Sequence, residues 1–277
     1  KMLADNPKAK YVYDLFGGGW AMSIEFASRT QIQKVHYNDF DTAIVSLLKK
    51  IRDEWVVDPL FFKWYSRAEY KYLVKWDDWI AWLMKTVWSF GNNHKGYLFS
   101  QENEYLKRPL HNVLVHRCRD SQKEFQEKYG VQISEEVFWE GSLYDRRLLL
   151  KKDFKDWKRL DIEQLERLQQ LERLQQLERL ERLEQLELSN LPYEQVQITT
   201  PIEETIIYLD PPYKNTAKYT KEIDHNALHK WIVKSPYKVY VSSYEWEWLE
   251  EVASIPKRVT LSAVANTLAH EKLFVNH

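Results

Sequence analysis

The sequence predicts an α/β fold whose sheet is interrupted by a long, mainly helical insert. A strand candidate near the N-terminus leads into three consecutive glycines, and a second apolar run, Thr205–Leu209, ends at a pair of prolines. Between the two, from Trp55 to Lys158, the chain is rich in Trp, Tyr and Lys and has mostly helical patterning. Strands do not alternate with helices there, so we interpret this segment as an insertion into an α/β domain.

Length and composition narrow the class of protein. With 277 residues the chain can form one large domain, or one domain with an insertion. Its 40 basic and 41 acidic residues nearly balance, so any nucleic-acid site must depend on local basic patches. Cys118 is the only cysteine, which excludes a disulfide framework and a cysteine-rich metal site. We see neither a signal peptide nor an apolar run of membrane-spanning length, and we expect a cytoplasmic protein.

The N-terminal part predicts a strand, a glycine turn, a helix and a second strand. The strand candidate Tyr11–Phe16 leads into Gly17-Gly18-Gly19, and such glycines permit a tight turn and a close approach of backbone to a ligand. A helix is expected over 20–28 and a strand over 34–37. Asp39 follows about 20 residues after the glycines, where an acidic side chain can bind ribose hydroxyls. The pattern favours a nucleoside-containing cofactor, and the alternative is a plain βαβ unit with a capping aspartate.

The helical insert follows a second expected helix at 41–51. Within it, residues 88–97 form a polar stretch that is punctuated by two glycines. This stretch combines amide, basic and aromatic side chains, the set that reads base edges and phosphates. Its candidates for DNA binding are Asn92, Asn93, His94 and Lys95. The alternative is an ordinary loop between helices.

Two further features mark the end of the insert. Basic residues that either line a phosphate track or form a solvated helix face are Arg146, Arg147, Lys151, Lys152, Lys155, Lys158 and Arg159. From Gln164 to Leu188, leucines recur at a spacing of three in a Leu-Glu-Arg-Leu-Gln-Gln repeat. Three residues turn a helix by about 300°, so these leucines form no single stripe and no heptad coiled coil is expected. The composition favours a helix, and a small solenoid is the alternative.

The most informative stretch of the chain is Asp210-Pro211-Pro212-Tyr213. It follows the buried strand candidate at 205–209, and its two prolines stiffen the backbone at the carboxyl end of that strand. Open α/β sheets bind their ligands at such strand ends. Asp210 and a proline carbonyl can accept the two hydrogens of a planar amino group, while Tyr213 stacks on the attached ring. The alternative is a Pro-Pro turn with a capping aspartate.

The C-terminal part supplies the rest of the predicted sheet. A basic and aromatic stretch comes first, and its candidates for DNA contact are Lys214, Lys218 and Tyr219. The other expected elements are a strand beginning near 186, a helix capped by Asp224, a strand at 238–243, a helix at 246–253 and two antiparallel edge strands at 257–263 and 272–275.

The order of these pieces resembles the Dam-like DNA adenine N6-methyltransferases of the α group. The resemblance depends on Asp14-Leu15-Phe16-Gly17-Gly18-Gly19, then Asn38-Asp39, the helical insert and Ile207–Tyr213. It covers residues 11–52 and 186–277, whereas the insert matches mainly by position. It implies a Rossmann-like class I methyltransferase sheet at 1–55 and 186–277, with an inserted, mainly helical target-recognition domain at 56–185.

The resemblance also implies S-adenosylmethionine as the cofactor. The residues that would bind it are Asp14, Phe16, Gly17, Gly18, Gly19, Asp39, Tyr193 and Asp210. Phe16 and the glycines would form a loop on the methionine side, and Asp39 would bind the ribose hydroxyls. A contact with the cofactor adenine falls by position at Pro192-Tyr193, with Asp153-Phe154 as a more remote candidate.

The implied reaction is methyl transfer to the N6 amino group of an adenine that is flipped out of double-stranded DNA. The catalytic residues would be Asp210, Pro211, Pro212 and Tyr213. Direct transfer needs no metal, and the histidines have no metal-ligand spacing. Two alternatives are a methyltransferase that acts on RNA or on a protein amide, and a nucleic-acid-binding relative without catalysis.

Three features depart from the pattern of the family. The acidic residue often found at the position of Pro192-Tyr193 is absent, and Trp20 follows the glycines where many members have a small residue. The family places a cofactor motif with Lys and Gly before the first strand. Only Lys1-Met2 can be its remnant, so we expect the chain to be trimmed at its N-terminus.

Overall fold

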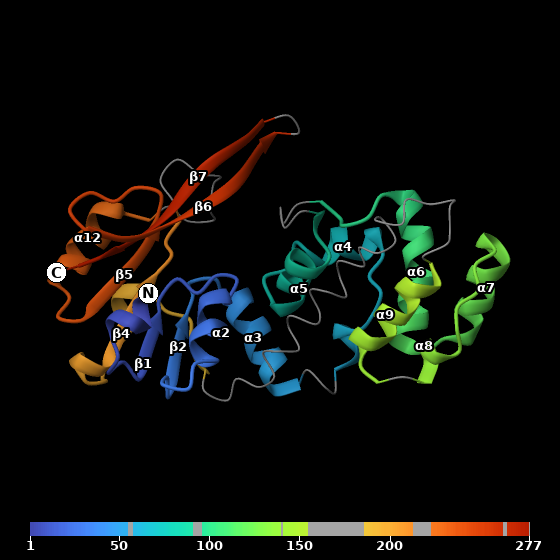
Figure 1. Cartoon of the computed structure of the whole chain (residues 1–277), viewed down its shortest axis with the longest axis horizontal. Helices are drawn as coiled ribbons and strands as arrows, with labels where there is room; N and C mark the ends of the chain where they lie inside the picture. The colour runs from blue at the N-terminus through green and yellow to red at the C-terminus, as the bar shows by residue number, and fades with distance from the viewer. Residues whose placement is uncertain are drawn as a thin grey trace. The chain divides into compact units, whose positions relative to one another are not determined.

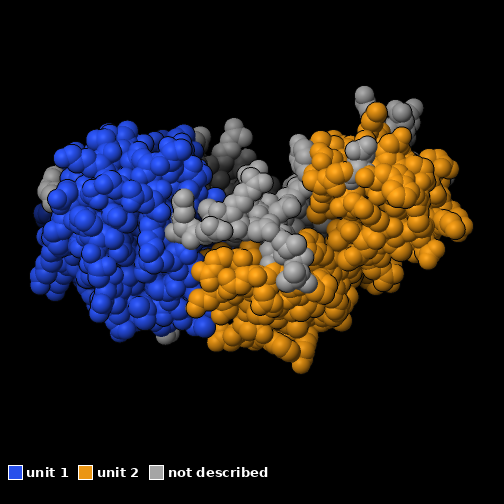
Figure 2. Space-filling view, turned by 90° about the horizontal axis from the view of Figure 1, so that it is seen from below, with its two compact units in different colours: residues 1–45, 183–277 blue, residues 46–182 orange. Residues whose placement is uncertain are grey.

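The computed structural model describes residues 1–54, 58–90, 96–139, 141–154, 186–212, 223–262 and 265–276. The chain divides into two compact units, residues 1–45 with 183–277 and residues 46–182 (Figure 2). The first unit contains the sheet, and the described part of the second unit is built from helices (Figure 1).

Seven strands form one mixed sheet in the order β3-β2-β1-β4-β5-β7-β6. The strands are β1 (Tyr11–Asp14), β2 (Lys34–Asn38), β3 (Leu186–Ser189), β4 (Thr205–Leu209), β5 (Lys238–Ser243), β6 (Glu250–Ser262) and β7 (Ala265–Val275). The strands β1 to β5 pair in parallel, whereas β7 pairs antiparallel with both β5 and β6. The strand order reverses between β1 and β4, and ligands bind at such a switch point, outside the carboxyl ends of the strands. The expected Rossmann-like sheet is confirmed.

Helices cover both faces of the sheet in the first unit. These helices are α1 (Met2–Asp5), α2 (Ala21–Ala27), α12 (His225–Lys234) and α3 (Thr42–Glu54), which continues into the second unit. In β4, Ile207 and Leu209 pack with Leu228 of α12, and the ring of Tyr208 lies 6.2 Å from that of Phe26 in α2. Since alternate residues of a strand point to opposite faces, α12 and α2 lie on different faces. The apolar run of β4 is therefore buried on both sides.

The described part of the second unit consists of short helices around an aromatic core. They are η1 (Pro59–Phe61), α4 (Arg67–Leu73), α5 (Trp79–Val87), α6 (Gln101–His116), α7 (Arg119–Tyr129), α8 (Glu136–Trp139) and α9 (Leu143–Asp153). Ser66, Asp78, Ser100 and Ser142 cap helices by accepting backbone N–H groups. The rings of Trp64, Trp88 and Phe99 pack together in the core. No helix of the described residues is long and apolar enough to cross a membrane.

The structure corrects the predicted helix at 246–253. No helix is present there: β6 begins at Glu250 and pairs with β7 (Figure 1). Trp248 has a φ of 72°, a left-handed conformation that a right-handed helix cannot include. The first strand also ends at Asp14 rather than at Phe16. Residues 164–185 of the leucine repeat lie outside the described residues, and Leu186–Leu188 belong to β3.

Candidate active site

Three carboxylates lie at the carboxyl ends of neighbouring strands. Asp14 is the last residue of β1, Asp39 follows β2, and Asp210 follows β4. Because β1 pairs in parallel with both β2 and β4, these strand ends meet at one edge of the sheet. The charges of Asp210 and Asp39 both act on Asp14 and raise its pKa. The sequence-predicted acids at 14, 39 and 210 are therefore brought together.

Asp14 is the buried member of this group. It is 1% exposed, and its Oδ2 accepts a hydrogen bond of 2.7 Å from the hydroxyl of Ser23 in α2. Its Oδ1 is buried and has no hydrogen-bond partner among the described residues. Burial above all raises the pKa of Asp14 to about 7, with Asp210 and Asp39 adding to the rise and Ser23 opposing it. The charge of this carboxyl group therefore changes near neutral pH.

The glycine loop turns tightly after β1 and is fastened to β2. The N–H of Gly17 donates to the carbonyl of Asn38 at 2.9 Å, and the N–H of Trp20 donates to the carbonyl of Gly17 at 2.7 Å. Gly18 has a φ of 43°, a region that favours glycine. Its N–H donates to Oδ2 of Asp39 at 2.8 Å. The loop therefore depends on Asp39 for part of its shape.

Trp20 departs from the family pattern, and the structure accommodates it. Its φ is 54°, a left-handed conformation that is strained for a large side chain. The side chain is 7% exposed, so its burial offsets the strain. The residue also precedes α2 as its N-cap. A bulky side chain therefore occupies a backbone position that suits a small residue.

Asp39 retains acceptor capacity although the backbone N–H groups of Gly18, Asp41 and Phe40 already bind it. Its Oδ2 accepts the N–H of Gly18 and its Oδ1 accepts the N–H of Asp41, both at 2.8 Å. The two carboxylate oxygens have four lone pairs, so the side chain can accept a further hydrogen bond. Burial raises the pKa of Asp39, and the hydrogen bonds from the backbone of Asp41, Gly18 and Phe40 oppose the rise. The side chain can therefore still accept a hydrogen bond from a hydroxyl group.

Asp210 and the prolines after it present an open edge. Asp210 is exposed, Pro211 is buried and Pro212 is half-buried. The charge of Asp210 contributes to a raised pKa at Tyr208 as well as at Asp14, so it acts on both adjoining strand ends. Tyr213, the fourth residue of the motif, lies outside the described residues, as do Lys214, Lys218 and Tyr219. Among the described residues, no group of three or more His, Cys, Asp or Glu side chains could hold a metal ion.

A family model for D12 class N6 adenine-specific DNA methyltransferases matches residues 1–230. The chain belongs to this family. The match includes the glycine loop, Asp39 and the Asp-Pro-Pro-Tyr motif, whereas β5, β6 and β7 lie beyond it. A search of the curated proteins found no match. The protein is therefore a methyltransferase that modifies the N6 amino group of adenine in DNA, and its family implies S-adenosylmethionine as the methyl donor.

Tyr193 joins the edge of this D12 site through an aromatic contact. It lies in the short helix η4 (Tyr193–Gln195), and its ring is 5.3 Å from that of Phe16 in the glycine loop. Trp231 of α12 packs edge-on against Tyr193 at 5.7 Å. The next residue, Glu194, is exposed and supplies an acidic side chain one position after the predicted pair. The structure thus brings Tyr193 to the glycine loop.

Asp153 and Phe154, the remote candidates for the cofactor contact, have structural roles in the second unit. One carboxylate oxygen of Asp153 accepts both the N–H and the hydroxyl of Ser134, at 2.9 and 3.0 Å. Phe154 is buried, and its ring lies 5.7 Å from that of Phe125. These contacts explain both side chains without a ligand.

Asn38, which the sequence analysis named only as the neighbour of Asp39, forms hydrogen bonds with several strand ends of this site. Its Nδ2 donates to the carbonyls of Leu15 and Leu191, at 3.2 and 3.0 Å. Its Oδ1 accepts the hydroxyl of Ser189 at 2.7 Å and the N–H of Leu191 at 3.0 Å. One buried amide thus ties the ends of β1, β2 and β3 together. Its signal in the sequence, an amide between a strand and an acid, does not reveal these partners.

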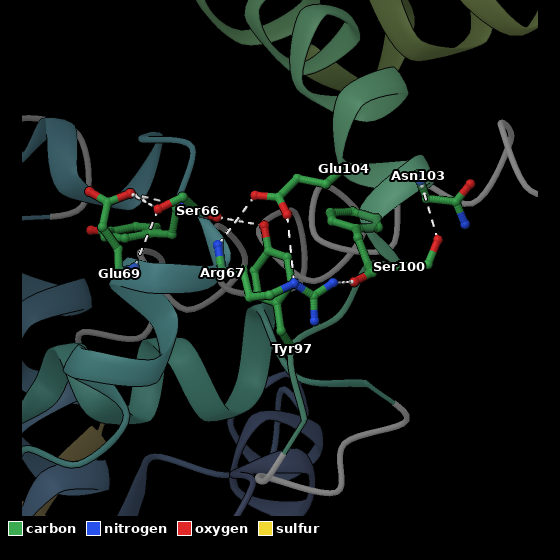
Figure 3. Close-up of polar contacts among 9 residues, drawn as sticks. Ser66, Arg67, Glu69, Tyr97, Ser100, Asn103 and Glu104 are labelled. Atoms are coloured by element: carbon green, nitrogen blue, oxygen red, sulfur yellow. Dashed lines mark hydrogen bonds and ion pairs between the residues drawn. The ribbon is translucent and has the colours of Figure 1, made fainter.

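The candidate DNA-binding residues Asn92, Asn93, His94 and Lys95 lie outside the described residues, but the residues on either side of them are well fixed. Ser89 and Tyr97 form an isolated antiparallel bridge. The guanidinium of Arg67 lies 5.0 Å from the centre of the Tyr97 ring, and the Tyr97 hydroxyl donates to the carbonyl of Tyr65 at 2.7 Å. Figure 3 shows Arg67 and Tyr97 beside Glu104. Ser89 and Tyr97, which flank the undescribed residues, are therefore tied to each other, and Tyr97 is tied to Tyr65 and Arg67.

Proposed function

We propose that the strand-end site of the first unit transfers a methyl group from S-adenosylmethionine to the N6 amino group of an adenine flipped out of double-stranded DNA. The observation that supports this assignment is the meeting of Asp14, Asp39 and Asp210 beside the glycine loop. Family membership indicates methyl transfer and adenine as the target base. The three carboxylates lie at the strand ends, where such sheets bind their ligands.

The residues present suit S-adenosylmethionine, which supplies an electrophilic methyl group when bound. Asp39 has acceptor capacity for a ribose hydroxyl. A Cβ added at Gly19 would have no atom of the described residues within 4 Å, so the loop backbone is open to a ligand there. Asp14 is buried just before the loop in the chain, so it would act on the cationic groups of the cofactor through the charge that it carries above about pH 7, rather than through surface contact. Phe16 and Tyr193 provide aromatic surface at the same edge.

Asp210 and the carbonyl of Pro211 accept the two hydrogens of the adenine amino group in this proposal. Two acceptors hold the nitrogen in one orientation and favour the pyramidal form that has an available lone pair. Such positioning lowers the activation barrier without a covalent intermediate. The buried ring of Pro211 keeps the carbonyl in place. Pro212 continues the rigid turn, and Tyr213 stacks on the extruded base.

The second unit supplies DNA recognition in this proposal. Residues 56–185 act as the target-recognition region, and its candidate contacts are Asn92, Asn93, His94 and Lys95. The fixed base formed by Ser89, Tyr97 and Arg67 supports that role, because recognition side chains need a rigid scaffold. Lys214, Lys218 and Tyr219 contact the DNA beside the catalytic motif.

The test measures transfer of labelled methyl groups from S-adenosylmethionine to duplex DNA, followed by nucleoside analysis. The wild-type chain should place the label in N6-methyladenine. Asp210→Ala should abolish transfer while cofactor binding stays measurable by calorimetry. Glu203→Ala is the matched control, because Glu203 is exposed and lies just before the amino end of the same strand. Full activity of Asp210→Ala would contradict the proposed role of Asp210.

A further inference from the structure

Arg146 is a buried arginine in α9, and two of its three guanidinium nitrogens have no hydrogen-bond partner among the described residues. The residue is 8% exposed, and the two nitrogens are Nε and Nη1. Lys151 and Lys152 on the same helix are exposed, whereas Arg146 is buried. Arg146 is therefore not part of a solvated basic face. Arginine is rarely buried unless it is paired, because burial removes the water that stabilises its charge.

The described neighbours of Arg146 do not neutralise its charge. Asp145, the adjacent residue, directs its carboxylate to the N–H and the hydroxyl of Ser142, at 3.1 and 2.6 Å, in the capping box of α9. The charged group that acts on Arg146 is a second cation, Arg117. Burial and the Arg117 charge together lower the pKa of the Arg146 guanidinium. The positive charge of Arg146 is thus both desolvated and repelled by the positive charge of Arg117.

Arg117 lies at the end of α6, which packs against α9. It is exposed and has a φ of 51°, a left-handed conformation in which glycine is the usual residue. An arginine at this position costs backbone strain that glycine would avoid. Strained residues cluster at binding sites, where the side chain is needed for its chemistry.

We propose that Arg146 and Arg117 form a phosphate-binding site in the second unit, and that its ligand is a phosphate of the DNA backbone. The planar guanidinium of Arg146 carries two buried, unpaired nitrogens whose N–H groups match the geometry of phosphate oxygens, and Arg117 is the exposed member of the pair. A bound phosphate would neutralise the repulsion between the two arginines. The choice of DNA over a free phosphate follows from the proposed function, whereas the anion site itself does not depend on it.

The anion site is tested without DNA, by thermal unfolding in buffers with and without inorganic phosphate at matched ionic strength. Phosphate should raise the unfolding temperature of the wild-type chain and have little effect on Arg146→Met. Without phosphate, Arg146→Met should be at least as stable as the wild type, because an unpaired buried charge gives way to an apolar side chain. Arg146→Lys keeps the charge but loses the planar fork, so its response should be weaker. An Arg146→Met chain that responds to phosphate like the wild type would overturn the site.

The DNA assignment is tested by the salt dependence of duplex binding, measured by fluorescence anisotropy. Loss of one phosphate contact should reduce the slope of log K against log salt by about 0.9 for Arg146→Met. Lys152→Gln removes one exposed charge from the same helix and should leave the slope close to the wild-type value. Equal losses in both variants would indicate a solvated basic face and would contradict the proposal. A phosphate response with an unchanged DNA slope would assign the site to a free phosphate instead.

Methyl transfer by the wild-type chain is measured in the same buffers. Absence of transfer would count against the proposed function, while the effect of phosphate on unfolding would still decide the anion site. The two proposals can therefore fail separately.

Discussion

The ring of Tyr37 fills the space that a side chain on Gly17 would need. A Cβ at Gly17 would lie 2.0 Å from Cε2 of Tyr37, well inside van der Waals contact. The ring cannot move aside easily, because Tyr37 is fully buried and its hydroxyl donates to the carbonyl of Gly18 at 2.9 Å. The second strand therefore determines the path of the loop that follows the first.

This contact predicts that two glycine substitutions differ in their effect on the free energy of unfolding. Gly17→Ala should reduce the free energy of unfolding by roughly 1–3 kcal/mol, because the methyl group overlaps the Tyr37 ring. Gly19→Ala should leave stability almost unchanged, since none of the described atoms lies within 4 Å of the added Cβ. If the loop backbone binds the cofactor there, Gly19→Ala should still weaken S-adenosylmethionine binding. Urea unfolding and calorimetry measure the two effects.

A double-mutant cycle identifies the cause of the loss. The substitution Tyr37→Leu removes the ring, so Gly17→Ala should cost less in that background than in the wild-type chain. An equal cost in both backgrounds would show that the Tyr37 ring is not what restricts Gly17.

The raised pKa of Asp14 predicts that stability falls as pH rises. Its pKa is about 7 in the folded chain and 3.8 in the absence of burial, so the folded state holds the proton more tightly than the unfolded state. The contribution of Asp14 to the free energy of unfolding is fully present below about pH 4. It is lost as pH rises through 7, at a rate on the order of 1 kcal/mol per pH unit. Asp14→Asn keeps an oxygen that can accept from Ser23 but carries no charge. It should flatten this pH dependence and be more stable than the wild type at pH 8.

The measurement is the free energy of unfolding in urea at several pH values between 4.5 and 8. Asp39 has a raised pKa as well and contributes a slope of the same sign, so a smaller slope should persist in Asp14→Asn. Identical pH profiles for the wild type and Asp14→Asn would contradict the burial of a titrating carboxyl group at this position.

The strand ends could be predicted from the sequence because their signals are local. Two prolines after an apolar run located Asp210, and the distance along the chain from the glycines after the first strand located Asp39. The roles of Tyr37 and Asn38 could not be predicted in this way, because their partners lie in β3 and in the loop after β1 and depend on how the strands pair. Family membership accounts for the reaction, but it does not name these supporting side chains.

Two other features needed the tertiary structure. From the sequence, the basic residues around Arg146 could either line a phosphate track or form a solvated helix face. Only the packing of α9 against α6 and α8 shows that Arg146 is buried. The predicted helix at 246–253 failed because pairing with β7 determines the conformation of residues 250–253. Local propensity is a weak guide where long-range strand pairing competes with it.

Two left-handed tryptophans predict stability changes of opposite sign. Trp248 has a φ of 72° and is 81% exposed, whereas Trp20 has a φ of 54° and is 7% exposed. Trp248→Gly should raise the free energy of unfolding by about 0.5–1 kcal/mol, because strain is relieved and little burial is lost. Trp20→Gly should lower it by roughly 2–4 kcal/mol, since the lost burial exceeds the relief. Trp139→Gly is the control: Trp139 is 74% exposed in α8 and is not among the residues with positive φ, so no gain is expected. A loss of stability in Trp248→Gly as large as that in Trp139→Gly would show that the left-handed backbone at 248 carries no strain.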